Sequence, residues 1–199
     1  PLPNVVARVD GAAVVGPRTP PPALDDLPPP VFDGLNLRRY PTEMLPLQST
    51  SRCTWGQCVF CYHDDRHLPH DRRDVAGLVD DMQALAERTG IRSFFLADCE
   101  TPMPTMEALA DLLLERGLDL RWSALARADD RFTPERCERL YASGLRVLMI
   151  GLETTSEEAL VKLRKGITVD TVERSVRHAA GAGIANFLFV LEYPGDTLE

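Results

Sequence analysis

The sequence predicts an α/β fold in which a parallel β-sheet is covered by helices. From residue 44 onward, five short apolar stretches alternate with amphipathic stretches whose apolar residues recur at helical spacing. Repeated strand–helix units imply right-handed crossovers between parallel strands, in either an open doubly wound sheet or a barrel. In both architectures the chemistry lies at the carboxyl ends of the strands. We therefore look for functional residues directly after each expected strand.

The expected strands are short and apolar, and the first is followed at once by a cysteine-rich loop. They cover residues 44–48, 91–97, 118–124, 145–152 and 184–191. The chain ends just after the fifth strand, with no helix to cover it. We therefore expect a partial barrel that stops after about five strand–helix units, within a longer protein.

The expected helices lie between these strands and carry recognisable end signals. Helical spacing of apolar residues covers 75–86 and 106–114. Thr133 is expected to cap the next helix, with Pro134 at its first position and Gly144 after its end. Ser156 and Thr168 are expected to cap two further helices, the second of which ends near residues 181–183.

The N-terminal segment differs in composition from the rest of the chain. Eleven of the sixteen prolines lie in the first 46 residues, where no periodicity is sustained. Val5–Val9 and Ala12–Val15 flank an Asp-Gly pair and predict a small hairpin. Because proline lacks a backbone donor, the following stretch is expected to be an extended connector without helix. We assign residues 1–43 as a Pro-rich linker and the tail of a preceding domain, and residues 44–199 as a core incomplete at its C-terminus.

Composition limits the class of protein. The 199 residues are 44% apolar, which is enough to form a hydrophobic core. The cysteines number five, and three of them lie in one loop, so a set of structural disulfides is not expected. No stretch reaches 18 apolar residues and no signal peptide is apparent, so we expect a cytoplasmic protein without a membrane partner. The net charge of −8 argues against nucleic acid, because phosphate binding needs clustered Lys and Arg. A small molecule or a peptide is the expected substrate.

Three cysteines within nine residues follow the first expected strand. Cys53, Cys58 and Cys61 have the spacing C-x4-C-x2-C. Three thiolates can bind three irons of a cubane cluster and leave the fourth iron open, whereas ferredoxin-type clusters use four. Structural zinc is the alternative, with a fourth ligand from His63, His67 or His70, although a second ligand pair is absent from the sequence. The spacing favours an iron–sulfur cluster, but a structural zinc site remains an open alternative at this point.

The surrounding residues resemble the cluster loop of radical S-adenosylmethionine (SAM) enzymes. Residues 51–61 read Ser-Arg-Cys-Thr-Trp-Gly-Gln-Cys-Val-Phe-Cys, similar to the subgroup that often carries an N-terminal cobalamin-binding domain. The glycine usual before the first cysteine is missing, and Thr54 replaces a common aromatic. Further similar segments follow in the family's order, at residues 27–35, 40–41, 151–154, 164–168 and 193–197. The resemblance implies a partial parallel (β/α) barrel of the radical SAM type and a missing domain that binds cobalamin.

This resemblance implies the cofactors and the reaction. A [4Fe-4S] cluster is expected on Cys53, Cys58 and Cys61, with SAM on the fourth iron, and cobalamin as a further cofactor. Reductive cleavage of SAM would give a 5′-deoxyadenosyl radical. The expected activity is methyl transfer to a peptide or small molecule. The alternatives are a cyclase, mutase or sulfur-inserting radical SAM enzyme, or a zinc-stabilised α/β binding module. An electron donor such as flavodoxin or ferredoxin is implied, and no catalytic residue is assigned.

Five residues are candidates for cofactor binding on the basis of this resemblance. Phe60 is expected to pack on the cluster or adenine, or else within its loop. Asp98 and Glu100 follow the second strand and could face the SAM amine, with turn capping as the other reading for Asp98. Arg127 follows the third strand and could hold the SAM carboxylate, or pair with Asp129 or Asp130. Glu153 ends an apolar strand and needs a partner, which ribose or the SAM amine could supply.

Most of the remaining residues with reactive or aromatic side chains are expected to be structural. Trp122 is assigned to the core, Cys99 and Cys137 are read as small apolar residues, and His178 as a cation near a helix C-terminus. Tyr62 could share the role of Phe60. The three histidines at 63, 67 and 70 are read as a solvated loop, with a role in substrate entry left open.

Overall fold

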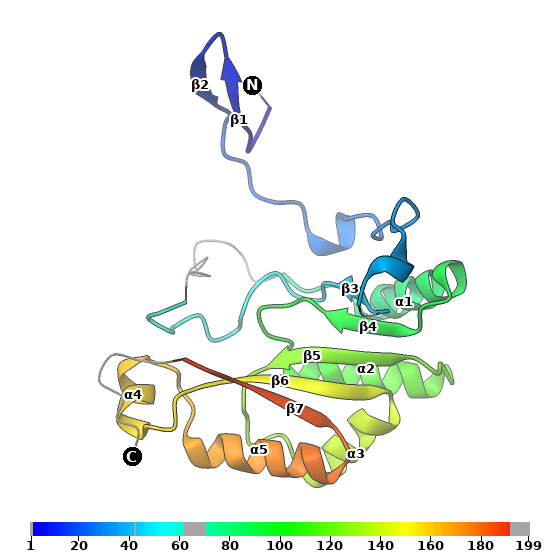
Figure 1. The fold of residues 1–199 in the computed structure, drawn as a ribbon, viewed down its shortest axis with the longest axis vertical. Helices are drawn as coiled ribbons and strands as arrows, with labels where there is room; N and C mark the ends of the chain where they lie inside the picture. Colours follow the sequence, from blue (N-terminus) through cyan, green and yellow to red (C-terminus); the bar gives the residue numbers. More distant parts are fainter. Residues whose placement is uncertain (1, 42, 62–70, 192–199) are drawn as a thin grey trace.

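A five-stranded parallel sheet forms the centre of the computed structural model, which describes residues 2–41, 43–61 and 71–191 (Figure 1). The strands lie in sequence order, with bounds β3 Leu45–Leu47, β4 Ser93–Leu96, β5 Arg121–Ala126, β6 Leu145–Glu153 and β7 Ala185–Val190. Each neighbouring pair is parallel. The α/β class and the five expected strands are therefore confirmed.

The third strand begins later than the sequence pattern predicts. Residues 118–120 were expected in the strand, but they form the turn after α2, where the amide of Leu118 donates to Leu113 O at 3.0 Å. Parallel pairing starts only at Arg121, which lies opposite Ser93. Leu118 and Leu120 still pack against the core, so apolar content alone could not separate turn from strand.

The helices follow the strands, and three of them begin at the caps expected from the sequence. Their bounds are α1 Val75–Thr89, α2 Met103–Glu115, α3 Pro134–Ala142, α4 Glu157–Lys162 and α5 Val169–Gly181. The hydroxyls of Thr133, Ser156 and Thr168 each accept a hydrogen bond from a backbone amide in the first turn. Asp74, which the sequence analysis did not single out, caps α1 through Gly77 N at 2.9 Å.

The core lies between the sheet and the row of helices α1, α2, α3 and α5 (Figure 1). Along β6, Leu148 and Ile150 are fully buried, whereas the alternate residues Val147 and Met149 are only half-buried. Successive side chains of a strand point to opposite faces. The helices therefore cover one face closely, and the other face is the more open one. Trp122 is 1% exposed, as expected for a core residue.

The N-terminal segment forms the expected hairpin and then packs on the edge of the core. Strands β1 (Val6–Val9) and β2 (Ala12–Val15) pair antiparallel, and Asp10 and Gly11 both have positive φ, as a tight hairpin turn requires. The connector is not wholly extended, because it contains 3-10 turns at Leu24–Asp26 and Leu37–Arg39. Such a turn needs only one i to i+3 hydrogen bond, so it fits between prolines. Whether residues 1–43 belong to a separate domain stays a prediction.

Within the described residues, no helix is both long enough and apolar enough to cross a membrane.

We predict that Gly144→Ala lowers the free energy of unfolding by several kcal/mol. Gly144 has φ +106° between α3 and β6, and a Cβ there would overlap the carbonyl oxygen of Leu120. A left-handed backbone costs a non-glycine residue about 1–2 kcal/mol, and the overlap adds to it. The matched control is Gly90→Ala, which has φ +76° but open space around the Cβ position. Equal losses in urea unfolding of the two variants would contradict the steric explanation.

Candidate functional site

The loop that carries the three cysteines leaves β3 at the carboxyl end of the sheet, and Asp98 fixes its start. The Asp98 carboxylate is 4% exposed and follows β4. It accepts hydrogen bonds from Ser49 N (2.7 Å), Ser49 Oγ (2.5 Å), Thr50 N (3.0 Å) and Thr101 Oγ1 (2.8 Å). A buried charge is tolerated when it is hydrogen-bonded in this way. Asp98 therefore joins the loop to β4, and its contact with SAM stays a prediction.

Glu100 holds the same loop one step further along, beside the first cysteine. Its carboxylate, 7% exposed, accepts from Thr54 N and Thr54 Oγ1, both at 2.7 Å. Burial raises the pKa of the Cys53 thiol, and the negative charge of Glu100 raises it further. Thr54, which departs from the family's usual aromatic, thus has a defined partner. Glu100 and Cys53 are neighbours because they follow the adjacent strands β4 and β3.

The other side of the cysteine loop rests on the turn between α4 and α5, residues 163–166. Val59 N donates to Leu163 O at 3.1 Å, and Trp55 Nε1 donates to Arg164 O at 2.8 Å. The Trp55 ring lies so close to Gly166 that a Cβ at this position would overlap it. Gly166 has φ +67°, which also favours glycine. We call residues 163–166 the supporting turn.

Arg127, after β5, lies between Trp55 and the supporting turn. Its guanidinium carbon is 4.7 Å from the centre of the Trp55 ring, and Nη2 donates to Gly166 O at 3.3 Å. Nη1 is buried and has no hydrogen-bond partner in the described part of the chain. Because an unpaired buried donor is costly, this atom is a candidate to bind an anionic group such as a carboxylate.

A cleft of about 640 Å³ opens beside Arg127. Its walls come from the cysteine loop, the ends of β4 and β5, the supporting turn and the start of α5, with lining residues that include Thr54, Trp55, Glu100, Asp130, Ile167 and Thr171. This volume is in the range of small-molecule sites. The cleft is therefore large enough for a cofactor or substrate.

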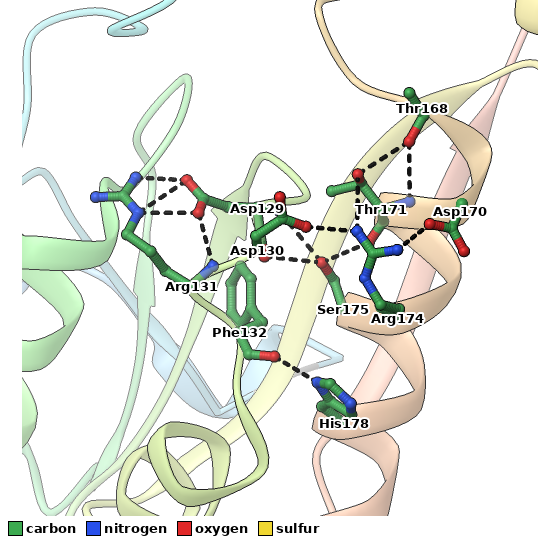
Figure 2. A network of polar contacts seen from close by, with 10 residues as sticks. All are labelled: Asp129, Asp130, Arg131, Phe132, Thr168, Asp170, Thr171, Arg174, Ser175 and His178. Carbon is green, nitrogen blue, oxygen red and sulfur yellow. Dashed lines mark hydrogen bonds and ion pairs between the residues drawn. The ribbon is translucent and has the colours of Figure 1, made fainter.

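A polar network fixes the far rim of this cleft (Figure 2). Arg131 binds both carboxylate oxygens of Asp129 and thereby lowers the pKa of that carboxyl. Arg174 of α5 binds Asp130 at 2.6 Å, and Ser175 Oγ donates to Asp129 O at 3.2 Å. Both aspartates thus have partners on this rim, and the alternative ion pairs with Arg127 are not formed in the described structure.

The same network gives His178 a structural contact. Its Nδ1 lies 2.6 Å from Phe132 O (Figure 2), which joins α5 to the segment before α3. This agrees with the structural reading of His178.

Glu153 has a protein partner, which sequence reasoning did not find. Lys165 Nζ of the supporting turn donates to Glu153 Oε1 at 2.6 Å, and the two side chains are 10% and 9% exposed. The same ammonium is 5.7 Å from the centre of the Phe60 ring, and Phe60 is 41% exposed. Lys165 does lie in one of the segments that resemble the family, residues 164–168. A single lysine, however, has no characteristic spacing from Glu153 that would identify it as the partner.

The three loop cysteines are free and half-buried. Burial raises the pKa of Cys58, and the positive charges of Lys165 and Arg127 act in the opposite direction. In the described ranges, no three Cys, His, Asp or Glu side chains are gathered as ligands of one metal ion. A cubane cluster takes one thiolate on each iron, so its ligands need not converge on one atom. Three free thiols, with two cations near Cys58, fit such a cluster, and the unpaired Arg127 donor fits a carboxylate.

Some predicted residues cannot be placed. Tyr62, His63, His67, His70 and the segment 193–197 lie outside the described residues, so their predicted roles stay predictions. Cys137 is fully buried in α3, away from this loop, as expected for a small apolar residue.

The sequence matches the radical SAM superfamily over residues 47–199. This match covers most of the chain. The chain belongs to the radical SAM superfamily. No curated protein sequence matches it.

Solved structures of radical SAM enzymes share the fold. The radical SAM methyltransferase TsrM from Kitasatospora setae, with tryptophan and a SAM analogue bound, aligns with a TM-score of 0.75 and 22% identity over 98% of this chain. The cobalamin-dependent enzyme OxsB aligns with a TM-score of 0.72 and 18% identity over 93%. Methylornithine synthase aligns with a TM-score of 0.53 and 19% identity over 73%. This chain spans 42% of that TsrM chain and 29% of that OxsB chain.

We predict that Asp98→Asn lowers the free energy of unfolding by about 3 kcal/mol, because the amide presents donors to groups that are themselves donors. Urea unfolding of the cluster-free protein measures this loss. The control is Asp119→Asn, whose side chain is 96% exposed and whose removal should change stability by no more than about 0.5 kcal/mol. A loss at Asp98 as small as that at Asp119 would show that the carboxylate does not anchor the loop.

We also predict that iodoacetamide at pH 8 leaves Cys137 unmodified in the native, cluster-free protein. Burial raises the pKa of Cys137 to about 11, so the reactive thiolate is scarce at pH 8 and the side chain is inaccessible. The half-buried cysteines of the loop should react. Peptide mapping by mass spectrometry distinguishes the sites, and alkylation of Cys137 before unfolding would contradict its placement.

Proposed function

We propose that this chain carries the cluster-binding and SAM-binding core of a radical SAM enzyme that works with cobalamin and transfers a methyl group to a peptide or small molecule. One observation carries the first part of this proposal. Three free thiols lie on a loop at the carboxyl end of the sheet, beside an arginine with an unpaired buried donor. This is the arrangement that a cluster and a carboxylate-bearing cofactor require.

The proposed ligands of the [4Fe-4S] cluster are Cys53, Cys58 and Cys61. When bound, the cluster and SAM supply reductive cleavage of a carbon–sulfur bond and removal of a hydrogen atom from an unactivated carbon. Arg127 Nη1 is the proposed donor to the SAM carboxylate. Its stacking on Trp55 and its bond to Gly166 O hold the guanidinium in place, so little rotational freedom is lost on binding.

The role of cobalamin is supported by the extent of the structural likeness. The TsrM alignment covers 98% of this chain, so it must include most of residues 1–43. The alignment with methylornithine synthase covers only 73%. The N-terminal segment therefore resembles part of a methyltransferase that has been solved with cobalamin bound. We propose that a cobalamin-binding domain precedes it and that methyl transfer, rather than cyclisation, rearrangement or sulfur insertion, is the outcome.

The test is anaerobic reconstitution of the complete protein with iron and sulfide. We expect a brown protein with broad visible absorption that forms 5′-deoxyadenosine from SAM when reduced. Each of Cys53→Ala, Cys58→Ala and Cys61→Ala should lower cleavage at least 100-fold, because a cluster with one ligand removed is not held in a SAM-binding form. The matched control is Cys137→Ala, whose side chain lies outside the site.

The outcomes separate the alternatives. A colourless protein that contains stoichiometric zinc and is unchanged by iron and sulfide would contradict the enzyme proposal and support a zinc-stabilised binding module. Cleavage retained in any of the three variants would contradict the ligand assignment. Cluster formation and SAM cleavage without cobalamin binding would retain the radical SAM core and contradict methyl transfer.

A further inference from the structure

The ion pair between Glu153 and Lys165 is built into the backbone around it. Gly151 lies directly against the pair, and a Cβ at this position would overlap both the Glu153 carboxylate and the Lys165 ammonium. A side chain at residue 151 would therefore displace the pair. The pairing of β6 with β7 shifts register between Gly151 and Glu153, which allows the strand to turn its last carboxylate toward the supporting turn.

The local backbone is also strained on both sides of this pair. Glu153 has φ +71°, and Arg164, directly before Lys165, has φ +51°. Non-glycine residues adopt such angles only at a cost in free energy. Strained backbone conformations concentrate at functional sites. The chain thus accepts strain on both elements that present the two charges.

Stability alone gives little reason for a buried ion pair at this place. Removing two charges from water costs free energy that their attraction only partly returns, and apolar residues often serve as well or better. The Lys165 ammonium, however, is close to the cysteine loop. It lies 5.7 Å from the centre of the ring of Phe60, a residue between Cys58 and Cys61 in the sequence, and Val59 N of the same loop donates to Leu163 O of the supporting turn at 3.1 Å.

We propose that Lys165 is a positioning residue that sets the charge next to the cluster: its ammonium neutralises Glu153 and thereby makes one-electron reduction of the cluster easier. This inference rests on the proposed function. Reduction adds one negative charge to the cluster, and a nearby buried carboxylate without its cation would oppose that addition. Because both side chains are about nine-tenths buried, solvent screens this effect only weakly.

The test is a redox titration of the reconstituted protein with dithionite, without SAM, followed by electron paramagnetic resonance of the reduced cluster. Lys165→Met should shift the midpoint potential to more negative values, because it leaves Glu153 unpaired. Glu153→Gln should shift it to more positive values, because it leaves the ammonium unpaired. The double variant should return close to the wild-type potential, and Lys165→Arg should retain it. A purely structural role would not give single variants with opposite signs.

The matched control removes a cation of the same kind from a nearby solvent-exposed pair. Lys162 lies three residues away at the end of α4 and binds Glu158 at 2.7 Å, with both side chains more than half exposed. Lys162→Met should leave the potential unchanged because water and salt screen this pair. Urea unfolding of each cluster-free variant checks that it folds.

The outcomes also separate this inference from the proposed function. Equal potentials in wild type, Lys165→Met and Glu153→Gln, or shifts of the same sign in the two variants, would overturn the inference and leave the proposed function intact. If Lys165→Met takes up no cluster, the Glu153→Gln variant provides the test. A midpoint potential of Glu153→Gln that is not more positive than that of the wild type would overturn the inference. A wild-type protein that takes up no cluster would overturn the proposed function and this inference together.

Discussion

The site depends on one buried carboxylate that must be satisfied. Asp98 lies in the protein interior after β4, and three of its four donors come from the first residues of the cysteine loop, Ser49 and Thr50. Because an unpaired buried charge would be costly, these donors cannot move away independently. The loop therefore starts from a fixed point on the sheet. Glu100 repeats this arrangement two residues later by binding Thr54, so the segment that follows β4 positions the loop around Cys53.

The charged side chains near the cysteines come from other elements of the fold and not from the cysteine loop itself. Glu100 places a negative charge beside Cys53, whereas Lys165 and Arg127 place positive charges near Cys58. These side chains come from the ends of β4 and β5 and from the supporting turn, each of which is held by its own backbone contacts. An iron–sulfur cluster responds to such nearby charges because burial reduces screening by solvent.

The sequence predicted the parallel strands, the caps of three helices and the loop that carries the thiols, because these depend on local patterns. Residues 118–120 were misassigned because apolar residues pack equally well in a turn. The partners of Asp98 and Glu153 could not be predicted. Hydrogen bonds and ion pairs between elements that are distant in sequence give no regular residue spacing that could be recognised. Resemblance to the family pointed to Asp98, Glu100 and Arg127 as neighbours of a cofactor. The contacts that hold these residues in place, including the packing of Trp55 against Gly166, are visible only in the three-dimensional structure.

The contact between the cysteine loop and the supporting turn has a consequence for the order of assembly. Trp55 and Arg164 are 109 residues apart in sequence, yet the indole donates to the carbonyl that follows α4. Closing a contact across so long a stretch of chain costs conformational entropy, which the contacts of the intervening elements must offset. During synthesis, the three thiols emerge well before the residues against which their loop settles. The contact that supports the cysteine loop therefore cannot form until the chain has been made as far as Arg164.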